Sequence, residues 1–176
     1  MNTYLELKSK IEVNFKKAKS KKDMRFYLLC LMALESGARV SDLLRLEWSN
    51  IDAGNSIISF LNKKSKKHQQ QNISLNTVNY ITNYKECLEF NEIRECIFFN
   101  KDKNSIMSRV TANRRTQKEF GINFHKLRKE SGQNIAGQKG VVMASKFLGH
   151  SKVSTTDLYL KISDKEYLKQ MQGVSI

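Results

Sequence analysis

Five side chains, spread along the sequence, have the types that are needed to cut a phosphodiester. In chain order they are Arg39, His125, Arg128, His150 and Tyr159, and Tyr159 follows His150 by nine residues. A tyrosine must lose its proton as it attacks, because its ordinary pKa is about 10. Arginine stays charged and fits phosphate oxygens, and histidine can transfer protons. The ordered set indicates attack by Tyr159 on a phosphodiester, with charge stabilisation that needs no metal.

Each of these residues has an ordinary structural explanation when it is taken singly. An arginine after a helix-ending glycine usually lies at the surface or in an ion pair, and a lone histidine is usually a surface residue or a hydrogen-bonded core residue. A tyrosine in an amphipathic helix usually packs in the core. A Gly-His pair after an apolar helix is a common helix end. It is the order and spacing of the whole set that favour the chemical interpretation.

The overall charge favours a polyanionic partner. Lys and Arg number 31 against 17 Asp and Glu, for a formal net charge of +14 and a sequence pI near 9.7. Nucleic acid is the first expectation and a membrane surface the second, with a basic surface that serves only solubility as the alternative. The longest apolar run, residues 26–34, is far shorter than the roughly twenty residues of a membrane span.

The three cysteines are odd in number and lack a CxxC spacing. They indicate reduced thiols in a cytosolic protein, and no cysteine-histidine cluster has the spacing of a zinc site. The first residues lack the basic-then-apolar layout of a signal peptide. We therefore expect a cytoplasmic, nucleoid-associated protein with neither a metal nor another cofactor.

Three short segments together resemble the boxes of the tyrosine recombinase (phage integrase) family. In the first, residues 36–43, Gly37 stands two positions before Arg39, and Asp42 stands where the family more often has glutamate. The second, residues 125–128, is a His-x-x-Arg box. The third contains Leu, Gly and His followed by a tyrosine at the spacing that is typical of the family.

The resemblance extends over residues 24–163, most of the chain. Two features depart from the family pattern: Lys129 follows the second box where histidine is common, and the predicted hairpin is rich in glutamine and lacks the usual glycine at its tip. Neither departure removes one of the five residues. The implied fold is that of the family's catalytic domain.

The resemblance implies a specific reaction on double-stranded DNA. Tyr159 would attack the scissile phosphate, giving a 3′-phosphotyrosyl link and a free 5′-hydroxyl. Arg39 and Arg128 would hold the phosphate oxygens, while His125 and His150 would assist proton transfer and bind the phosphate. Strand exchange would conserve the bond energy, so neither metal nor ATP is required. The implied function is site-specific recombination or integration of a mobile element.

Two other functions stay open from the sequence. One is a type IB topoisomerase activity, which uses the same covalent chemistry to relax DNA; the short chain and the closing box favour recombination over it. The other is a DNA-binding accessory protein that occupies sites without cutting. Retention of all five residues argues against an accessory protein, because binding alone needs no such tyrosine.

The family also uses a lysine from a β-hairpin as general acid toward the leaving 5′-oxygen. The polar hairpin tip offers four lysines, of which Lys64, followed by Ser65, best matches the family's Lys-Thr pair. The alternative is that all four only touch the DNA backbone. Candidates for DNA contacts are the neighbouring lysines and the arginines of a later basic helix, namely Lys63, Lys66, Lys67, Arg109, Arg114 and Arg115.

Helices and one small antiparallel sheet must position these residues, so the predicted fold is mostly α (α+β). A buried helix is expected over residues 24–35, ended by Gly37, and Ser41 is expected to cap a short helix. Strands are expected over residues 55–61, 72–75 and 96–99, the first two as a hairpin with a long basic tip. Further helices are expected around residues 78–88 and over residues 106–120, 125–136, 141–147, 155–162 and 164–170.

We expect a single catalytic domain over residues 1–176, with a basic, solvated arm or helix over residues 1–22 and a tail over residues 164–176. The family usually carries a separate N-terminal helical domain that clamps DNA; we expect it to be absent, the chain being either a catalytic fragment or a short member. The final segment of the family often docks on a neighbouring protomer. This predicts self-association on DNA through the segment after Tyr159, with packing on its own domain as the alternative.

Overall fold

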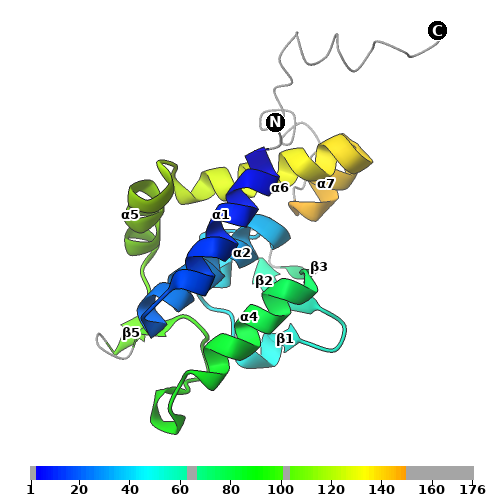
Figure 1. Ribbon diagram of the computed structural model, residues 1–176. Coiled ribbons are helices and arrows are strands. Elements are labelled where there is room, and N and C mark those ends of the chain that lie inside the picture. The colour runs from blue at the N-terminus through cyan, green and yellow to red at the C-terminus, as the bar shows by residue number, and fades with distance from the viewer. Residues whose placement is uncertain (1–2, 63–66, 101–103, 150–176) are drawn as a thin grey trace, which may run out of the picture.

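The computed structural model describes residues 3–62, 67–100 and 104–149. Over these residues the chain is mostly helical with small antiparallel sheets, which confirms the expected α+β class. Figure 1 shows α2 (Lys21–Ser36) in the middle of the fold, with α1 (Thr3–Lys17) lying across it. No helix in this part of the chain is long and apolar enough to cross a membrane.

Helix α2 forms the centre of the core because it is apolar on nearly every side. All residues over 26–34 are buried. The helix begins after Ser20, whose hydroxyl accepts a hydrogen bond from the backbone N–H of Asp23, and it ends at Gly37, which has a φ of 61°. The buried helix predicted over residues 24–35, and its end at Gly37, are confirmed.

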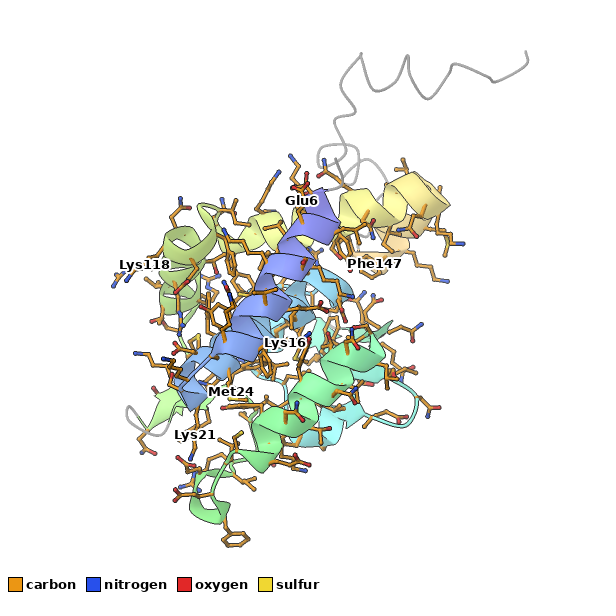
Figure 2. All side chains as sticks on the ribbon, viewed as in Figure 1. Glu6, Lys16, Lys21, Met24, Lys118 and Phe147 are labelled. Carbon is orange, nitrogen blue, oxygen red and sulfur yellow. The ribbon has the colours of Figure 1, made fainter. Side chains whose placement is uncertain are left out.

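The lysine-rich N-terminal segment is a helix with one buried face and one solvated face. Helix α1 buries Ile11 and Phe15, four residues apart, and packs on α2. The ammonium of Lys8 lies 2.7 Å from Oε1 of Glu35 in α2. Figure 2 labels Lys16 on α1 and shows the side chains around this helix. The expected helix is confirmed, and its solvated character is only partly right: three of its four lysines are exposed, while one apolar face is buried.

Three strands form the main sheet, in the order β1 (Ile51–Asp52), β2 (Ile57–Asn62) and β3 (Lys67–Asn72). Both pairings are antiparallel, so β3 lies at one edge of this sheet. The strand predicted over residues 55–61 is confirmed as β2.

The second strand of the hairpin lies earlier in the chain than predicted. The expected strand over residues 72–75 is wrong: β3 takes up the glutamine-rich segment, and Ser74 then caps α4 (Leu75–Glu86). Glutamine has little strand preference of its own, so this pairing depends on the neighbouring β2 rather than on local sequence.

A second, two-stranded sheet pairs β4 (Phe99–Asn100) with β5 (Ser105–Ile106). The sequence predicts a strand over residues 96–99 in the main sheet and a helix from residue 106. The predicted strand is found only from Phe99, which pairs with Ile106 in a separate sheet. For the same reason the predicted helix begins later, at Arg109.

Three helices complete the described part of the chain, namely α5 (Arg109–Phe120), α6 (Phe124–Lys139) and α7 (Val141–Phe147). They confirm three of the expected helices, with α5 beginning after a Ser108 cap and α6 after an Asn123 cap. Helix α6 packs against both α2 and α7. The helices expected over residues 155–162 and 164–170 lie outside the described residues.

The short helix α3 (Val40–Leu43) begins before the position that the sequence predicts. Arg39 is its N-cap residue, with an extended backbone and no capping hydrogen bond from its side chain, so the expected Ser41 cap is wrong. The 3₁₀ turns Trp48–Asn50 and Phe90–Glu92 flank the strands.

Candidate active site

The structure brings three of the five predicted residues to one cavity. Arg39, His125 and Arg128 all line a hollow of about 580 Å³ between α3, α5 and α6. Helix α5 supplies the facing wall through one group of side chains, Arg109, Val110, Asn113 and Arg114. Basic groups from three separate elements therefore surround one volume large enough for a phosphate and its neighbours.

The end of α2 places Arg39 at this cavity. Gly37 adopts a left-handed conformation, and a Cβ built on it would lie 2.5 Å from Cε1 of Phe147. Only glycine tolerates both that backbone and the close approach of α7. The chain then turns sharply, and Arg39 enters α3 with its side chain at the cavity.

Helix α6 presents His125 and Arg128 on one side, because residues three apart share a helix face. Arg128 is only 4% exposed. Its Nη1 donates to the carbonyl oxygen of Gly37, and its Nη2 donates to that of Leu148 at 2.7 Å. A guanidinium has five N–H groups, so these bonds fix the plane of Arg128 without using every donor. Arg128 thus joins the end of α2, α6 and the end of α7.

The electrostatic environment favours a neutral His125. Partial burial lowers the pKa of His125 below its ordinary value, and the positive charges of Arg128, Arg39 and Lys129 lower it further. The residue keeps an exposed edge at the cavity. A neutral imidazole near pH 7 is able to accept a proton.

Asp42 supplies a negative charge close to the arginines. It is 5% exposed, and burial raises the pKa of its carboxyl, although Arg39 acts in the opposite direction. Its Oδ1 accepts a hydrogen bond from Ser41 at 3.4 Å, while its Oδ2 has no hydrogen-bond partner among the residues that the structure describes. Asp42 therefore offsets part of the positive charge around the cavity.

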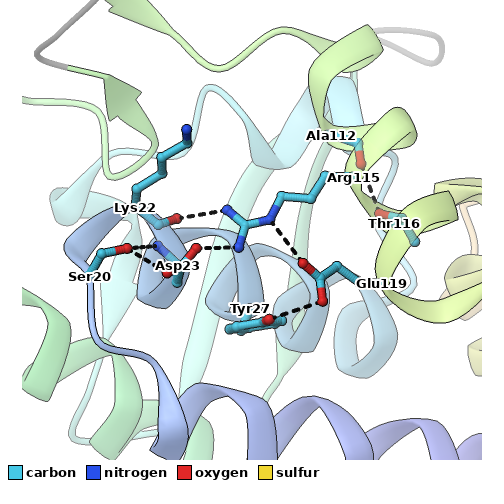
Figure 3. A network of polar contacts seen from close by, with 8 residues as sticks. All are labelled: Ser20, Lys22, Asp23, Tyr27, Ala112, Arg115, Thr116 and Glu119. Atoms are coloured by element: carbon cyan, nitrogen blue, oxygen red, sulfur yellow. Dashed lines mark hydrogen bonds and ion pairs between the residues drawn. The ribbon is translucent and has the colours of Figure 1, made fainter.

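Two of the predicted DNA contacts, Arg109 and Arg114, are exposed and line the cavity. Arg115 points elsewhere, as Figure 3 shows. Its guanidinium pairs with Asp23, lies 3.8 Å from Glu119 and covers the ring of Phe26 at 4.2 Å. These contacts hold α5 against the start of α2, so Arg115 has a structural role, and its contact with DNA stays a prediction.

The remaining predicted residues are not placed by the described part of the chain. Lys63, Lys64, Lys66, His150 and Tyr159 lie outside it, and Lys67 begins β3. Within residues 3–62, 67–100 and 104–149, no three His, Cys, Asp or Glu side chains gather where they could hold a metal ion.

Sequence reasoning missed two cavity residues on α5, Val110 and Asn113. The Oδ1 of Asn113 accepts a hydrogen bond from the backbone N–H of Phe124 at 2.9 Å, which fixes the start of α6. The i, i+1, i+4 spacing of Arg109, Val110 and Asn113 is the signal that could have found them, because it defines one side of a helix.

The sequence matches the Phage integrase family over residues 8–166, and the chain belongs to this family. The match begins inside α1, earlier than the resemblance seen in the sequence. A curated relative, described as a probable integrase/recombinase of Acholeplasma phage L2, is 28% identical over 164 residues. That alignment covers 86% of this chain and 54% of the relative, so the chain spans about half of the relative's length.

Solved structures of recombinases share the fold. XerA recombinase superposes with a TM-score of 0.77 at 19% identity, over 95% of this chain and 62% of that one. XerH site-specific recombinase, bound to difH substrate in a pre-cleavage complex, superposes with a TM-score of 0.70 at 16% identity. That superposition covers 98% of this chain and 53% of the XerH chain. A lambda integrase dimer bound to a COC′ core site superposes with a TM-score of 0.63 at 21% identity, over 86% of this chain and 45% of the integrase chain. The fold of this chain is therefore that of these recombinases.

Proposed function

We propose that this chain is the catalytic part of a site-specific DNA recombinase or integrase. The observation that carries the proposal is the cavity at which Arg39, His125 and Arg128 meet. Arg39 comes from the first box and the start of α3, whereas His125 and Arg128 come from the second box on α6. The two arginines carry positive charge that suits a phosphate, and His125 can transfer a proton. Membership of the Phage integrase family supports the same function.

The proposed reaction exchanges one phosphate ester for another. The Tyr159 oxygen forms a bond to phosphorus as the bond from phosphorus to the 5′-oxygen breaks, which leaves a 3′-phosphotyrosyl link. In this proposal the tyrosine proton passes to neutral His125, and Lys64 protonates the leaving 5′-oxygen. A 5′-hydroxyl of another strand reverses the step. The ester bond is conserved throughout, so the scheme requires neither metal nor ATP.

Charge stabilisation in this scheme comes from the two arginines. Arg128 is held by hydrogen bonds to two backbone carbonyls, and Arg39 lines the same cavity. Donors that are fixed before the reaction cost no reorganisation when negative charge develops on the phosphate. His150 is the second proton-transfer and phosphate-binding residue of the proposal.

Double-stranded DNA is the proposed partner, with α5 as part of its binding surface. Arg109 and Arg114 stand at the cavity with the exposed Val110 between them. Arginines at this position can bind backbone phosphates and fix the DNA beside the nucleophile. The XerH and lambda integrase structures are described as bound to a difH substrate and to a COC′ core site, which supports a proposed partner of this kind.

The proposal extends to the organisation of the protein. Residues 1–176 act as one catalytic domain, the segment after Tyr159 mediates self-association on DNA, and the protein works at the nucleoid. Because relatives are about twice as long as the matched region, a DNA-clamping domain on a second polypeptide or a longer chain is compatible with this scheme.

A plasmid that carries two copies of a DNA segment flanking the gene tests recombination directly. The expected products are circles in which the two copies have exchanged partners, formed in the presence of EDTA. Relaxed plasmid with unchanged connectivity would instead support a type IB topoisomerase. Plasmid that is bound but neither exchanged nor relaxed would contradict both enzymatic functions and support an accessory protein.

A further inference from the structure

Two glutamines of β3 stand where the sheet faces the core. The antiparallel register places Gln69, Gln70 and Gln71 opposite Phe60, Ser59 and Ile58. Residues directly opposite in such a pair share a face of the sheet. Phe60 and Ile58 are buried, so Gln69 and Gln71 share the buried side while Gln70 is exposed on the other. Amide side chains on a core-facing side need polar partners.

Both inward glutamines meet the turn that ends α7, which we call the 147–149 turn. The Nε2 of Gln71 donates to the carbonyl oxygen of Phe147 at 2.8 Å. The amide of Gln69 packs on Gly149, which has a φ of 63°, so closely that a Cβ there would lie 2.7 Å from Oε1. The last carbonyls of a helix have no partner within the helix, so Gln71 satisfies one that would otherwise be orphaned.

The same turn is held from its other side by α6. Arg128 donates to the carbonyl oxygen of Leu148, the residue after Phe147. Two successive carbonyls of the 147–149 turn are thus bound by side chains from two different elements, β3 and α6. Any shift of β3 relative to α6 must break one of these hydrogen bonds or move the turn.

The contact between β3 and the 147–149 turn joins two elements that adjoin proposed catalytic residues in the sequence. Lys64 stands three residues before β3 in the sequence, and His150 directly follows the 147–149 turn. We propose that Gln71, supported by Gln69, is a positioning residue for the proposed reaction, because it fixes β3, which follows Lys64 in the sequence, to the turn that precedes His150. This inference rests on the proposed function.

The chain offers a matched pair of variants, Gln71→Met and Gln70→Met. Methionine keeps the length of glutamine and loses the amide. With nicked duplexes that trap the covalent adduct and with protein in excess, Gln71→Met is expected to slow adduct formation about tenfold, the equivalent of one hydrogen bond. Its DNA affinity should stay within about twofold of wild type, since the exposed surface is unchanged. Gln70→Met should leave both quantities near wild type.

A conservative variant separates positioning from simple loss of packing. Gln71→Lys restores an N–H donor of similar reach, and Gln70→Lys controls for its added charge toward DNA. We expect Gln71→Lys to recover most of the rate that Gln71→Met loses. Equal rates for Gln71→Met and Gln70→Met, or a loss in Gln71→Met that is entirely in affinity, would overturn the proposal.

Hydrogen exchange tests the coupling without using activity. In Gln71→Met the backbone amides of Leu148 and Gly149 should exchange about tenfold faster than in wild type, because the last turn of α7 opens more easily. In Gln70→Met they should exchange as in wild type. A wild-type chain that binds DNA but forms no adduct would contradict the proposed function, whereas unchanged exchange in Gln71→Met would contradict the positioning role itself.

Discussion

At the scale of single residues, Arg128 has a structural and a chemical role at once. It is buried, it donates to the carbonyl oxygens of Gly37 and Leu148, and it lines the cavity beside Arg39 and His125. The two hydrogen bonds that tie α6 to the ends of α2 and α7 therefore also orient the Arg128 guanidinium at the cavity. The positive charge it contributes also acts on its neighbour, because it helps to lower the pKa of His125.

The lowered pKa of His125 predicts the acidic side of the pH profile. A depressed folded-state pKa means that the neutral form is favoured, so the neutral base is present above that pKa and is lost as pH falls through it. The rate of adduct formation should therefore fall below about pH 6.5, the ordinary histidine value. His125→Gln should lower the rate and abolish this fall, and the exposed His68 provides the control through His68→Gln. A fall centred above the ordinary value, or one that survives His125→Gln, would contradict the assignment of His125.

Substitution of Gly37 by alanine is expected to destabilise the protein, and the same substitution at Gly121 provides the control. In Gly37→Ala the new Cβ meets the ring of Phe147 and the backbone keeps a positive φ. We expect a loss of about 2–4 kcal/mol in the free energy of unfolding, the sum of left-handed strain and overpacking. Gly121 has a φ of 71° with nothing within 4 Å, so Gly121→Ala should lose only about 1–2 kcal/mol. Urea unfolding compares the two, and equal losses would show that α7 does not press on Gly37.

At the scale of elements, one side of α5 lines the cavity and another side binds the start of α2. Arg109, Val110 and Arg114 face the cavity, while Arg115 binds the start of α2. Glu119 extends this second side, since its carboxylate accepts a hydrogen bond from Tyr27 at 3.2 Å. The network in Figure 3 therefore sets the angle at which α5 presents its cavity side.

Substitution of the adjacent Arg114 and Arg115 by methionine should affect different properties, DNA binding for Arg114 and stability for Arg115. Arg115→Met removes the ion pair with Asp23 and the ring contact with Phe26, so we expect about 1–2 kcal/mol of lost unfolding free energy, given the partial exposure of the pair. Arg114→Met should change stability by less than about 0.5 kcal/mol. It should instead weaken DNA binding and reduce the salt slope of the binding constant by about one. Urea unfolding and salt-dependent binding separate the two, and the reverse pattern would contradict our assignment of the α5 sides.

Sequence patterns predicted the elements whose signals are local and failed where a distant partner decides. The uniformly apolar α2, its end at Gly37, and the helices that carry His125 and the end of α7 follow from residues within each segment. The strand β3 was missed because its glutamines pair with β2 and bind Phe147, far along the chain. The structural role of Arg115 was missed for the same reason, since its partner Asp23 lies in another helix.

At the scale of the whole molecule, the fold gathers one basic cavity from segments that the sequence keeps far apart. The formal net charge of +14 favours a polyanionic partner, and α2 supplies the core against which α3 and α6 pack. Attraction alone would serve any DNA-binding protein. What distinguishes the proposed enzyme is a covalent link to DNA through one tyrosine.

The measurement that tests this claim most directly is covalent trapping on nicked duplexes drawn from DNA flanking the gene. Wild type and Tyr159→Phe are compared in EDTA, with binding measured on the same duplexes and the linked peptide identified after digestion. We predict a denaturation-resistant adduct at Tyr159 in wild type, and in Tyr159→Phe equal binding without an adduct. Duplexes that wild type binds without forming an adduct, or an adduct that persists in Tyr159→Phe, would contradict the account.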